Sequence, residues 1–372
     1  MNSLAILWDN FGPMHDDRVR AVARRMQNGA RVVGVEIFGS SETYEWESGP
    51  VEGFDKRTLF PGGSFSGVSV PRTAAEIIRE CRKLGAEHVF FCHYERPAVL
   101  LAASILRLSG CRVYTMSCSK FDDYERSVGR EWLKRIFFLP YHGAISSGLR
   151  ARDYMRLMGI PKERIATEYN TLSIDRIRRL SGKLPAPDGL PFADRHFTIV
   201  ARFVPKKNLA MALEGYALYR REAENPRPLH LCGSGPLEEA LREQVQSLGL
   251  TDHVVFRGFL QTDGIAQVLG DTLTLLLPSV EEQFGNVVIE AQAMGLPVIL
   301  SDNCGARDNL VRSGVNGFVI EPDSPQGLAF FMRLLDRDES LWRRMSLAAS
   351  ASAERGDAAR FAEAVQQLIE VR

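Results

Sequence analysis

Short apolar runs alternate with amphipathic stretches along most of the chain. The runs have the length of buried strands, and the stretches between them have the apolar spacing of helices. This alternation is typical of parallel sheets whose strands are joined by crossover helices. Two series of strands are predicted. The first comprises residues 4–8, 31–38, 88–93, 112–115, 144–146 and 165–168, and the second comprises residues 197–203, 229–232, 254–256, 272–277 and 298–301.

Two series of strands predict two α/β domains. The chain of 372 residues also exceeds the size at which a single hydrophobic core usually stops growing. Between the two series, residues 181–191 are rich in Pro and Gly and have no periodicity, as expected of a linker. We therefore expect a first domain over residues 1–180, a linker over residues 181–195 and a second domain over residues 196–355.

One connection in the first domain is longer than an ordinary loop between a strand and a helix. Residues 39–70 carry Gly, Ser and acidic residues around Tyr44, Trp46 and Phe54. A segment of this length is either a functional flap or a poorly ordered stretch, and the pattern favours neither.

Composition and charge exclude several classes of protein. The 46 Lys and Arg residues balance the 46 Asp and Glu residues, and the sequence has no known nucleic-acid-binding motif. Both observations argue against a nucleic-acid partner. No stretch is long or apolar enough to span a bilayer, and Asp9 interrupts the first apolar run too early for a signal peptide. The six Cys residues lack Cys-x-x-Cys spacing, which predicts free thiols in a reducing cytoplasm.

Glu282 and Glu290 form the most informative chemical pattern in the sequence. An apolar strand over residues 272–277 runs into a turn, and a helix over residues 286–294 follows, so one acid lies in the loop and the other about one turn into the helix. The free N–H groups of a helix N-terminus favour an anion. Carboxylates, in contrast, accept hydrogen bonds from sugar hydroxyls. The pattern predicts a ligand with polyols next to phosphate, and a nucleotide sugar fits that description.

This segment resembles the Glu-x7-Glu signature of the family 4 retaining glycosyltransferases, which have the GT-B fold. Residues 201–209 are similar to that family's Gly-Arg-x-x-x-x-Lys segment, with Ala201 in place of the leading Gly. Residues 232–236 and 256–260 resemble two further motifs in the expected order. The resemblance implies two Rossmann-like domains that face a central cleft, with residues 356–372 packing back on the first domain.

For the second domain the resemblance implies a donor site. Arg202 and Lys207 would hold the donor diphosphate and stabilise the negative charge that develops on it, and Glu282 would contact the transferred sugar. Glu290 would bind the ribose. Without the resemblance, the two cations would read as solvated residues near a helix start. The remaining donor contacts implied are Gly12, Gly233, Gly235, Phe259, Leu260, Phe284, Gly285, Asn286, Val287 and Val288.

The first domain carries weaker signals. Gly12 and His15 lie between the first strand and a helix, the usual place for a ligand loop in an open α/β sheet, although helix capping explains them equally well. Where many family members have a His after the fourth strand, this chain has a Ser-Lys-x-Asp-Asp sequence that resembles a variant in some bacterial polysaccharide-type members. By resemblance, acceptor contacts would come from His15, His93, Ser117, Lys120 and Asp122, with a solvated loop as the alternative for the last three.

A basic and aromatic stretch begins at Tyr124 and ends at Phe138. It contains Trp132 and several Arg and Lys residues at helical spacing. Such a face can dock on anionic lipid near a lipid-linked acceptor. The alternative is a core helix with a solvated basic edge.

The sequence therefore predicts a retaining glycosyltransferase of the hexosyltransferase type. It would move a sugar from a nucleoside diphosphate sugar to a glycan or lipid-linked acceptor in bacterial polysaccharide or glycoconjugate biosynthesis. No cofactor and no metal are expected, because no His residue has the spacing of zinc ligands. The expected location is the cytoplasm, with peripheral contact to the inner face of the membrane as an option. Two alternatives stay open, a non-catalytic GT-B scaffold or regulatory partner and a nucleotide-sugar epimerase on the same fold.

Overall fold

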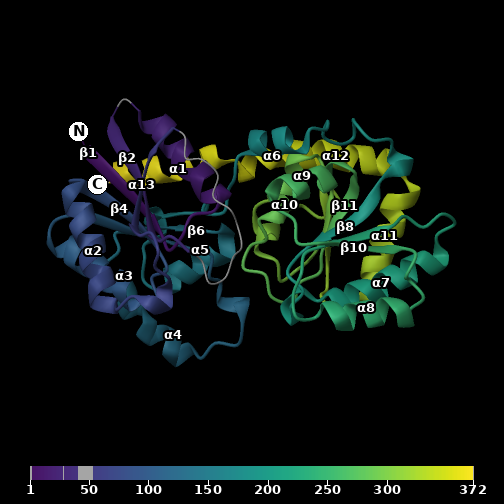
Figure 1. Ribbon diagram of the computed structural model, residues 1–372, viewed down its shortest axis with the longest axis horizontal. Coiled ribbons are helices and arrows are strands. Elements are labelled where there is room, and N and C mark those ends of the chain that lie inside the picture. Colours follow the sequence, from purple (N-terminus) through teal and green to yellow (C-terminus); the bar gives the residue numbers. More distant parts are fainter. Residues whose placement is uncertain (1, 28, 41–52, 372) are drawn as a thin grey trace. The chain divides into compact units, whose positions relative to one another are not determined.

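The computed structural model describes residues 2–27, 29–40 and 53–371. The chain divides into two compact α/β units (Figure 1). The first unit comprises Met1–Ser173 together with Ala358–Arg372, and the second comprises Ile174–Asp357. Each unit contains one parallel sheet with helices on both faces.

The first unit contains a seven-stranded sheet in the order β3-β2-β1-β4-β5-β6-β7. All neighbouring strands are parallel. Its strands are β1 (Asn2–Trp8), β2 (Ala30–Phe38), β3 (Asp55–Phe60), β4 (Ala86–Cys92), β5 (Arg112–Ser117), β6 (Gly143–Ser146) and β7 (Ile165–Ala166).

The central strand β1 contributes to two hydrophobic cores, because successive side chains of a strand point to opposite faces of the sheet. Leu4 and Ile6 belong to the core that α1 and α13 cover, whereas Ala5 and Leu7 belong to the core that α2 and α3 cover. The helices of this unit are α1 (Pro13–Met26), α2 (Val70–Lys83), α3 (Pro97–Leu108), α4 (Val128–Lys134), α5 (Gly148–Leu157) and α13 (Ala358–Glu370).

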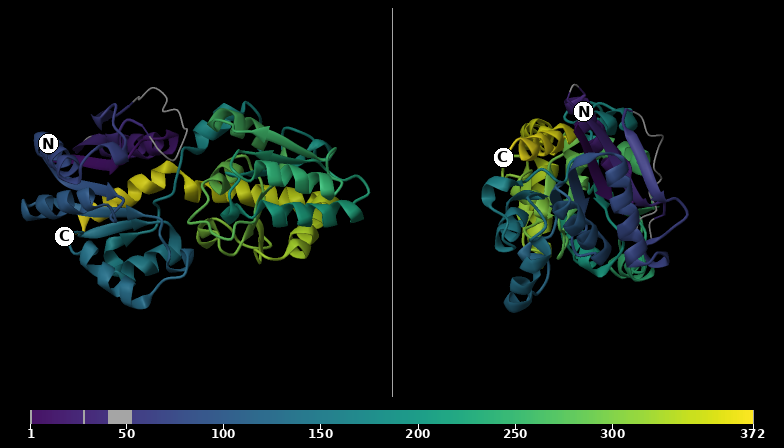
Figure 2. Two further views of the ribbon diagram at one scale, coloured as in Figure 1. Left: turned by 60° about the horizontal axis from the view of Figure 1, so that its bottom comes forward. Right: turned by 90° about the vertical axis from the view of Figure 1, so that its left-hand side faces the viewer.

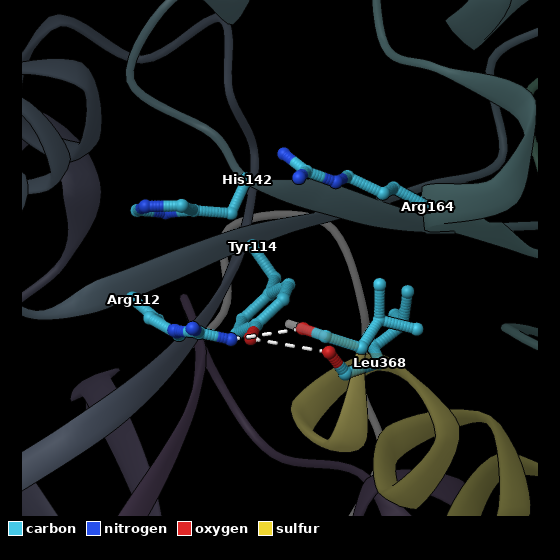
Figure 3. Close-up of a pocket in the computed structure, with 6 residues that line it drawn as sticks. Arg112, Tyr114, His142, Arg164 and Leu368 are labelled. Atoms are coloured by element: carbon cyan, nitrogen blue, oxygen red, sulfur yellow. Dashed lines mark hydrogen bonds between the residues drawn. The ribbon is translucent and has the colours of Figure 1, made fainter.

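The last helix, α13, packs against α1 in the first unit. Its carboxyl end is held at the amino-terminal edge of the sheet, where Arg112 Nη1 donates a hydrogen bond to the carbonyl of Val371 at 2.9 Å. The Tyr114 hydroxyl donates to the carbonyl of Leu368 at 3.3 Å. These residues line a cavity of about 60 Å³ together with His142 and Arg164 (Figure 3). A cation beside the last carbonyls of a helix also complements the helix dipole.

The second unit contains a six-stranded parallel sheet in the order β10-β9-β8-β11-β12-β13. Its strands are β8 (His196–Val200), β9 (Leu229–Cys232), β10 (Val254–Gly258), β11 (Thr272–Leu277), β12 (Val298–Ser301) and β13 (Gly317–Ile320). α7 packs against α11, while α6 packs against α9 and α10, and α10 contacts α12. The helices are α6 (Ile174–Ser181), α7 (Leu209–Glu222), α8 (Glu238–Ser247), α9 (Thr262–Gly270), α10 (Val287–Ala293), α11 (Pro325–Arg337) and α12 (Glu339–Ala353).

Two strands lie outside the predicted series. β3 falls within the long segment over residues 39–70 and lies at the edge of its sheet, so its polar sequence does not form an apolar run. β13 has four residues and follows a turn-rich stretch. Of the three aromatic residues noted in the long segment, Phe54 stacks on Phe11 with ring centroids 6.5 Å apart. Tyr44 and Trp46 lie outside the described residues.

The boundary between the units differs from the expected one. α6 belongs to the second unit, where it packs against α9, so the chain passes between units at residues 173–174. The expected linker over residues 181–195 lies inside the second unit. Ala186 is buried there, and its N–H donates to the carbonyl of Met294 at 2.8 Å. The Pro- and Gly-rich composition of this segment therefore marks tight turns packed on the unit, and the return passage occurs at residues 357–358.

Two further expectations concern thiols and membrane spans. All six Cys residues are free thiols, and Cys81, Cys232 and Cys304 are fully buried. Among the helices that the structure describes, none has both the length and the apolar character that a bilayer crossing requires.

Two histidines stack at the amino-terminal edge of the second sheet. The rings of His196 and His230 lie 3.7 Å apart, and both side chains are buried. Burial, together with the neighbouring His230, lowers the pKa of His196 to about 3. Burial and the nearby Arg257 lower the pKa of His230 to about 4. The folded unit therefore holds both rings neutral.

We expect the free energy of unfolding to decrease as the pH falls from about 6.5 to about 4, with each histidine contributing a slope of at most about 1.4 kcal/mol per pH unit. In this range the unfolded chain binds protons on both imidazoles and the folded pair does not, so acid favours the unfolded state. Urea denaturation at a series of pH values measures the slope. His230→Gln should make it shallower, and an unchanged slope in that variant would contradict the assignment.

Candidate active site

The order of strands in the second unit reverses between β8 and β11. The chain proceeds from β8 to β9 and β10 on one side of the sheet, and then returns to β11 on the other side of β8. In open α/β sheets ligands bind beyond the carboxyl ends of the strands at such a switch point. The loops that follow β8 and β11 are therefore the candidate site.

Main-chain hydrogen bonds join these two loops. The carbonyl of Lys206, after β8, accepts hydrogen bonds from the N–H groups of Val280 at 3.0 Å and Glu281 at 3.4 Å, after β11. Lys206 and Glu281 also form an ion pair at 3.3 Å. In the next position of each loop, Lys207 and Glu282 form a half-buried ion pair. The structure thus brings together two of the three residues that the sequence analysis assigned to catalysis.

Asn208 fixes the geometry of the first loop, and the sequence analysis did not single it out. Its φ of 58° is left-handed, a conformation that Asn tolerates better than most residues. The side-chain Nδ2 donates hydrogen bonds to the carbonyls of Pro278 at 3.1 Å and Pro322 at 2.6 Å. Asn208 therefore ties the start of α7 to the ends of two other strands. The only feature of the local sequence that could have indicated this role is an Asn directly before a helical stretch.

The loop after β12 supports the Glu282 segment from the other side. Gly305 N–H donates to the carbonyl of Glu282 at 3.1 Å, and Ala306 N–H donates to the carbonyl of Phe284 at 2.8 Å. Gly285 has a φ of 97°, and a Cβ there would lie 2.9 Å from a methyl carbon of Leu277. A side chain at this position would adopt an unfavourable backbone conformation and would also contact Leu277 too closely. Both the positive φ and the packing therefore require Gly at position 285.

The loop after β9 reaches the same edge of the sheet. Gly233 has a φ of 144°, and a Cβ there would lie 1.9 Å from the carbonyl oxygen of Ala201. Phe203 N–H donates to the carbonyl of Ser234 at 2.8 Å. Gly233 and Gly235 therefore lie against the backbone on both sides of Arg202, whose side chain is exposed.

The remaining donor-side residues differ in exposure. Glu290 is half-buried and lies in the first turn of α10, which begins one residue after Asn286. Phe284 and Val288 are buried, so their side chains belong to the core. Val287, Asn286 and Leu260 are half-buried, and Phe259 is 43% exposed after β10.

The first unit has its own switch point, between β1 and β4. Asp9, which follows β1, forms ion pairs with Arg96 and, at 3.8 Å, with His93, both of which follow β4. His93 has a left-handed φ of 61°, uncommon for a residue with a side chain, and its Nδ1 lies 3.2 Å from a carboxylate oxygen of Glu95. Burial alone would lower the pKa of His93, but Cys92, Glu95 and Asp9 hold it well above the ordinary value.

Gly12 and His15 lie at the start of α1. His15 Nδ1 accepts a hydrogen bond from Gly12 N–H at 2.9 Å, and its ring packs 4.8 Å from that of Trp8. Burial, together with the positive charge of Arg18, holds the pKa of His15 well below its usual range. A neutral His15 with an accepting Nδ1 therefore contributes to the cap of the helix, and the ligand contacts expected of Gly12 and His15 stay predictions.

The Ser-Lys-x-Asp-Asp residues have separate local partners. Ser117 is buried at the end of β5, and its hydroxyl accepts a hydrogen bond from Ser119 N–H at 3.2 Å. Lys120 is 1% exposed and forms an ion pair with the buried Asp123. Asp122 is exposed and pairs with Arg150 at 2.5 Å. A cluster of His, Cys, Asp or Glu that could hold a metal ion does not occur in the part of the chain that the structure describes.

Replacing Asn208 with Ala should lower the free energy of unfolding by about 2 to 3 kcal/mol, because it places Ala in a left-handed conformation and leaves two carbonyls without their donor. Asn208→Gly removes the same hydrogen bonds but tolerates the positive φ, so we expect a loss of about 1 kcal/mol. Urea denaturation of the two variants separates these contributions. Equal losses would show that backbone conformation does not matter here.

Comparisons with known proteins identify similar sequences and structures. Residues 185–352, somewhat less than half of the chain, match the family described as "Glycosyl transferases group 1". A putative colanic acid biosynthesis glycosyltransferase of Salmonella typhimurium is 29% identical over 181 residues, which is 47% of this chain and 43% of the relative. A D-inositol 3-phosphate glycosyltransferase of Streptomyces avermitilis is 30% identical over 214 residues, which is 55% of this chain and 46% of the relative. The matched segment thus spans less than half of these curated relatives.

The likeness in structure extends over the whole chain. The crystal structure of the Anabaena HepE protein in complex with UDP and glucose has a TM-score of 0.73 and 16% identity, and the match covers 100% of both chains. At this identity the likeness defines the fold. The chain therefore has the GT-B fold of two parallel-sheet α/β units, and its second unit contains the segment that matches the group 1 glycosyltransferases.

Proposed function

We propose that the chain is a retaining, metal-independent hexosyltransferase that moves a sugar from a nucleoside diphosphate sugar to a glycan or lipid-linked acceptor. The observation that carries the proposal is the contact between Lys207 and Glu282 at the switch point of the second sheet. Both residues lie within the segment that matches the group 1 glycosyltransferases. The names of the relatives support an acceptor in bacterial polysaccharide or glycoconjugate synthesis.

The donor diphosphate would bind at Arg202 and Lys207. Cleavage of the bond between the anomeric carbon and phosphate places negative charge on the diphosphate, and a preorganised guanidinium and ammonium stabilise that charge as it develops. In the structure the Lys207 ammonium contacts Glu282. A bound diphosphate would compete for this ammonium and leave the Glu282 carboxylate to accept hydrogen bonds from hydroxyls of the transferred sugar.

The nucleoside would extend along the same edge of the sheet. Glu290 would accept hydrogen bonds from the ribose hydroxyls, and the exposed Phe259, with Leu260, would lie beside the base. Gly285 and Gly233 keep side chains away from the places where the backbone would approach the sugar and the phosphates. The HepE protein was crystallised in complex with UDP and glucose, which supports a uridine nucleotide as the first donor to test.

Retention follows in this proposal from a same-face reaction. The bond from the anomeric carbon to the phosphate oxygen breaks while the bond to the acceptor oxygen forms on the same face. The proton of the acceptor hydroxyl passes to the departing phosphate oxygen, so the protein supplies no separate base. Arg202 and Lys207 would hold that oxygen in place.

The acceptor would bind to the first unit. We propose that Asp9, His93 and Glu95 contact its hydroxyls, because a charged imidazole between two carboxylates offers both donors and acceptors at the switch point of that sheet. Ser117 and Asp122 remain candidate acceptor contacts. Lys120 would act through Asp123, with which its ammonium is paired.

A donor nucleotide should raise the melting temperature, because a ligand that binds only the folded state stabilises it by RT ln(1 + [L]/Kd). Differential scanning fluorimetry with UDP, GDP and ADP identifies the base. Lys207→Ala should abolish most of the shift and lower kcat/KM by about two to three orders of magnitude. The matched control is Lys206→Ala, which removes the neighbouring lysine that pairs with Glu281 and should retain both properties within a few-fold.

Two outcomes would contradict the donor site. Equal losses in Lys206→Ala and Lys207→Ala would indicate a general effect of charge on the loop. The absence of a thermal shift with every nucleotide, together with no sugar transfer to lipid or glycan acceptors, would favour the non-catalytic scaffold.

Chelation should leave the activity unchanged, because cationic side chains are proposed to take the place of a divalent ion at the diphosphate. Turnover in excess EDTA tests this expectation. NMR of the product should show the anomeric configuration of the donor. Inversion, or loss of activity that Mg²⁺ or Mn²⁺ restores, would overturn the corresponding part of the proposal.

A further inference from the structure

The short helix α4 and the turn that follows it expose their apolar side chains. Six residues, which we call the α4 surface, combine large apolar side chains with high exposure. They are Val128 (72% exposed), Trp132 (64%), Leu133 (59%), Ile136 (61%), Phe137 (39%) and Leu139 (70%). Single exposed apolar residues are normal on a protein surface, but a contiguous group of this size marks an interaction site.

The inward side of the same segment is charged. Glu131, on α4, is 3% exposed and accepts hydrogen bonds from the Tyr154 hydroxyl, from Arg126 Nη1 at 3.4 Å and from Lys134 Nζ at 2.7 Å. The Arg126 guanidinium lies over the rings of Tyr124 at 4.2 Å and Tyr154 at 4.6 Å. α4 is therefore attached to its unit mainly by ionic and polar contacts, the reverse of an ordinary surface helix, which buries its apolar stripe.

The arrangement of the exposed residues forms one continuous stripe. Val128 and Trp132 are four residues apart on α4, so they lie on the same side of the helix, and the exposed Ile136 follows in the 3-10 turn over Arg135–Phe138. Figures 1 and 2 show α4 at the margin of the first unit. The stripe extends toward the end of α3, because Arg107 donates a hydrogen bond at 2.9 Å to the carbonyl of Pro140, and the next residue on α3, Leu108, is 88% exposed.

The charge around the stripe is positive. Residues 128–139 contain three basic residues and one acidic residue, and the acidic one is the buried Glu131. Arg130 and Arg135 are exposed, and within the described ranges neither forms an ion pair. The segment thus presents apolar side chains, one Trp and uncompensated guanidinium groups, which is the combination that an anionic lipid surface attracts.

We propose that the α4 surface docks on an anionic lipid bilayer. Trp132, Leu133, Ile136 and Leu139 enter the boundary between headgroups and acyl chains, and Arg130 and Arg135 contact lipid phosphates. Because the inward face is held by Glu131, the helix presents this surface without rearrangement. The inference rests on the proposed function only for its consequence, which is to bring a lipid-linked acceptor to the first unit.

Co-sedimentation with two kinds of vesicle at low salt tests the proposal. One kind contains equal parts of phosphatidylglycerol and phosphatidylcholine, and the other contains phosphatidylcholine alone. We expect binding to the anionic vesicles, weakened about tenfold or more by the double change Trp132→Ser and Ile136→Ser, and weakened by added salt. Arg130→Gln with Arg135→Gln should reduce the preference for the anionic vesicles. The matched control is Leu347→Ser, which changes a residue of α12 that is 61% exposed and should bind as the parent does.

Fluorescence locates the contact on the segment. The measurement uses a Trp46→Phe background, which leaves Trp8, Trp132 and Trp342. The emission of Trp132 should shift to shorter wavelength when anionic vesicles are added, and the shift should be absent when Trp132→Phe is added to that background, because Trp8 and Trp342 are buried.

Three results would overturn the proposal. The first is no binding to either kind of vesicle, and the second is equal binding by the parent and the Trp132→Ser, Ile136→Ser protein. The third is a dimer that forms without lipid and that dissociates into monomers when this double change is made. That result would show that the α4 surface binds a second copy of the chain. Failure of vesicle binding with an intact thermal shift by nucleotide would refute the membrane contact alone, so the two proposals fail separately.

Discussion

The site depends on the way in which two diverging loops are held together at the switch point of the second sheet. β8 and β11 are neighbours, but the chain leaves them in opposite directions, so nothing in the strands themselves keeps the following loops in contact. The carbonyl of Lys206 provides that contact by accepting two N–H groups from the loop after β11. Asn208 provides a second tie, to the carbonyl of Pro278. With the backbones fixed in this way, Lys207 and Glu282 meet, although 75 residues separate them along the chain.

In both units an ion pair joins the loops that follow the two neighbouring strands at the switch point, but the acidic and basic residues are interchanged. In the first unit an acid, Asp9, follows the first strand of the pair and a base, Arg96, follows the second. In the second unit the base, Lys207, follows β8 and the acid, Glu282, follows β11. Ion pairs of this kind gain little net free energy, because desolvation opposes the Coulomb attraction. In the proposed function each pair would therefore exchange a partner for a charged or hydroxylated ligand at a small net change in free energy.

Much of the fold could be predicted from the sequence because buried parallel strands are continuous apolar runs. β11 and β12 are buried along their whole length and were predicted with their observed bounds. β3 escaped prediction because an edge strand needs little apolar sequence. The first passage between the units was misplaced because the position of α6 depends on its packing against α9, which no local pattern records.

The site was predictable only where residue type and spacing are themselves specific. The spacing of Glu282 and Glu290 and the resemblance that covers Lys207 made these residues candidates. Neither indicated the role of Asn208, whose partners Pro278 and Pro322 lie far along the chain. The first unit shows the same limit. Its sequence drew attention to both Lys120 and His93. The structure buries the Lys120 ammonium against Asp123 and places His93, with its left-handed backbone, beside Asp9, and neither contact was indicated by the sequence.

The orientation of α4 shows most clearly what periodicity leaves undetermined. Apolar and basic residues at helical spacing define two faces but do not say which one turns inward. Here Glu131 determines which face is buried, because Arg126 and Tyr154 donate hydrogen bonds to its carboxylate that an apolar residue could not accept. With the acid buried, Trp132 and Ile136 lie on the outer side, where they stay in contact with water and add little hydrophobic stabilisation to the unit. The segment is held by the ionic contacts beneath it and by Phe138, which is buried against Tyr94, and an apolar, anionic phase that covered its exposed apolar side chains and guanidinium groups would lower its free energy.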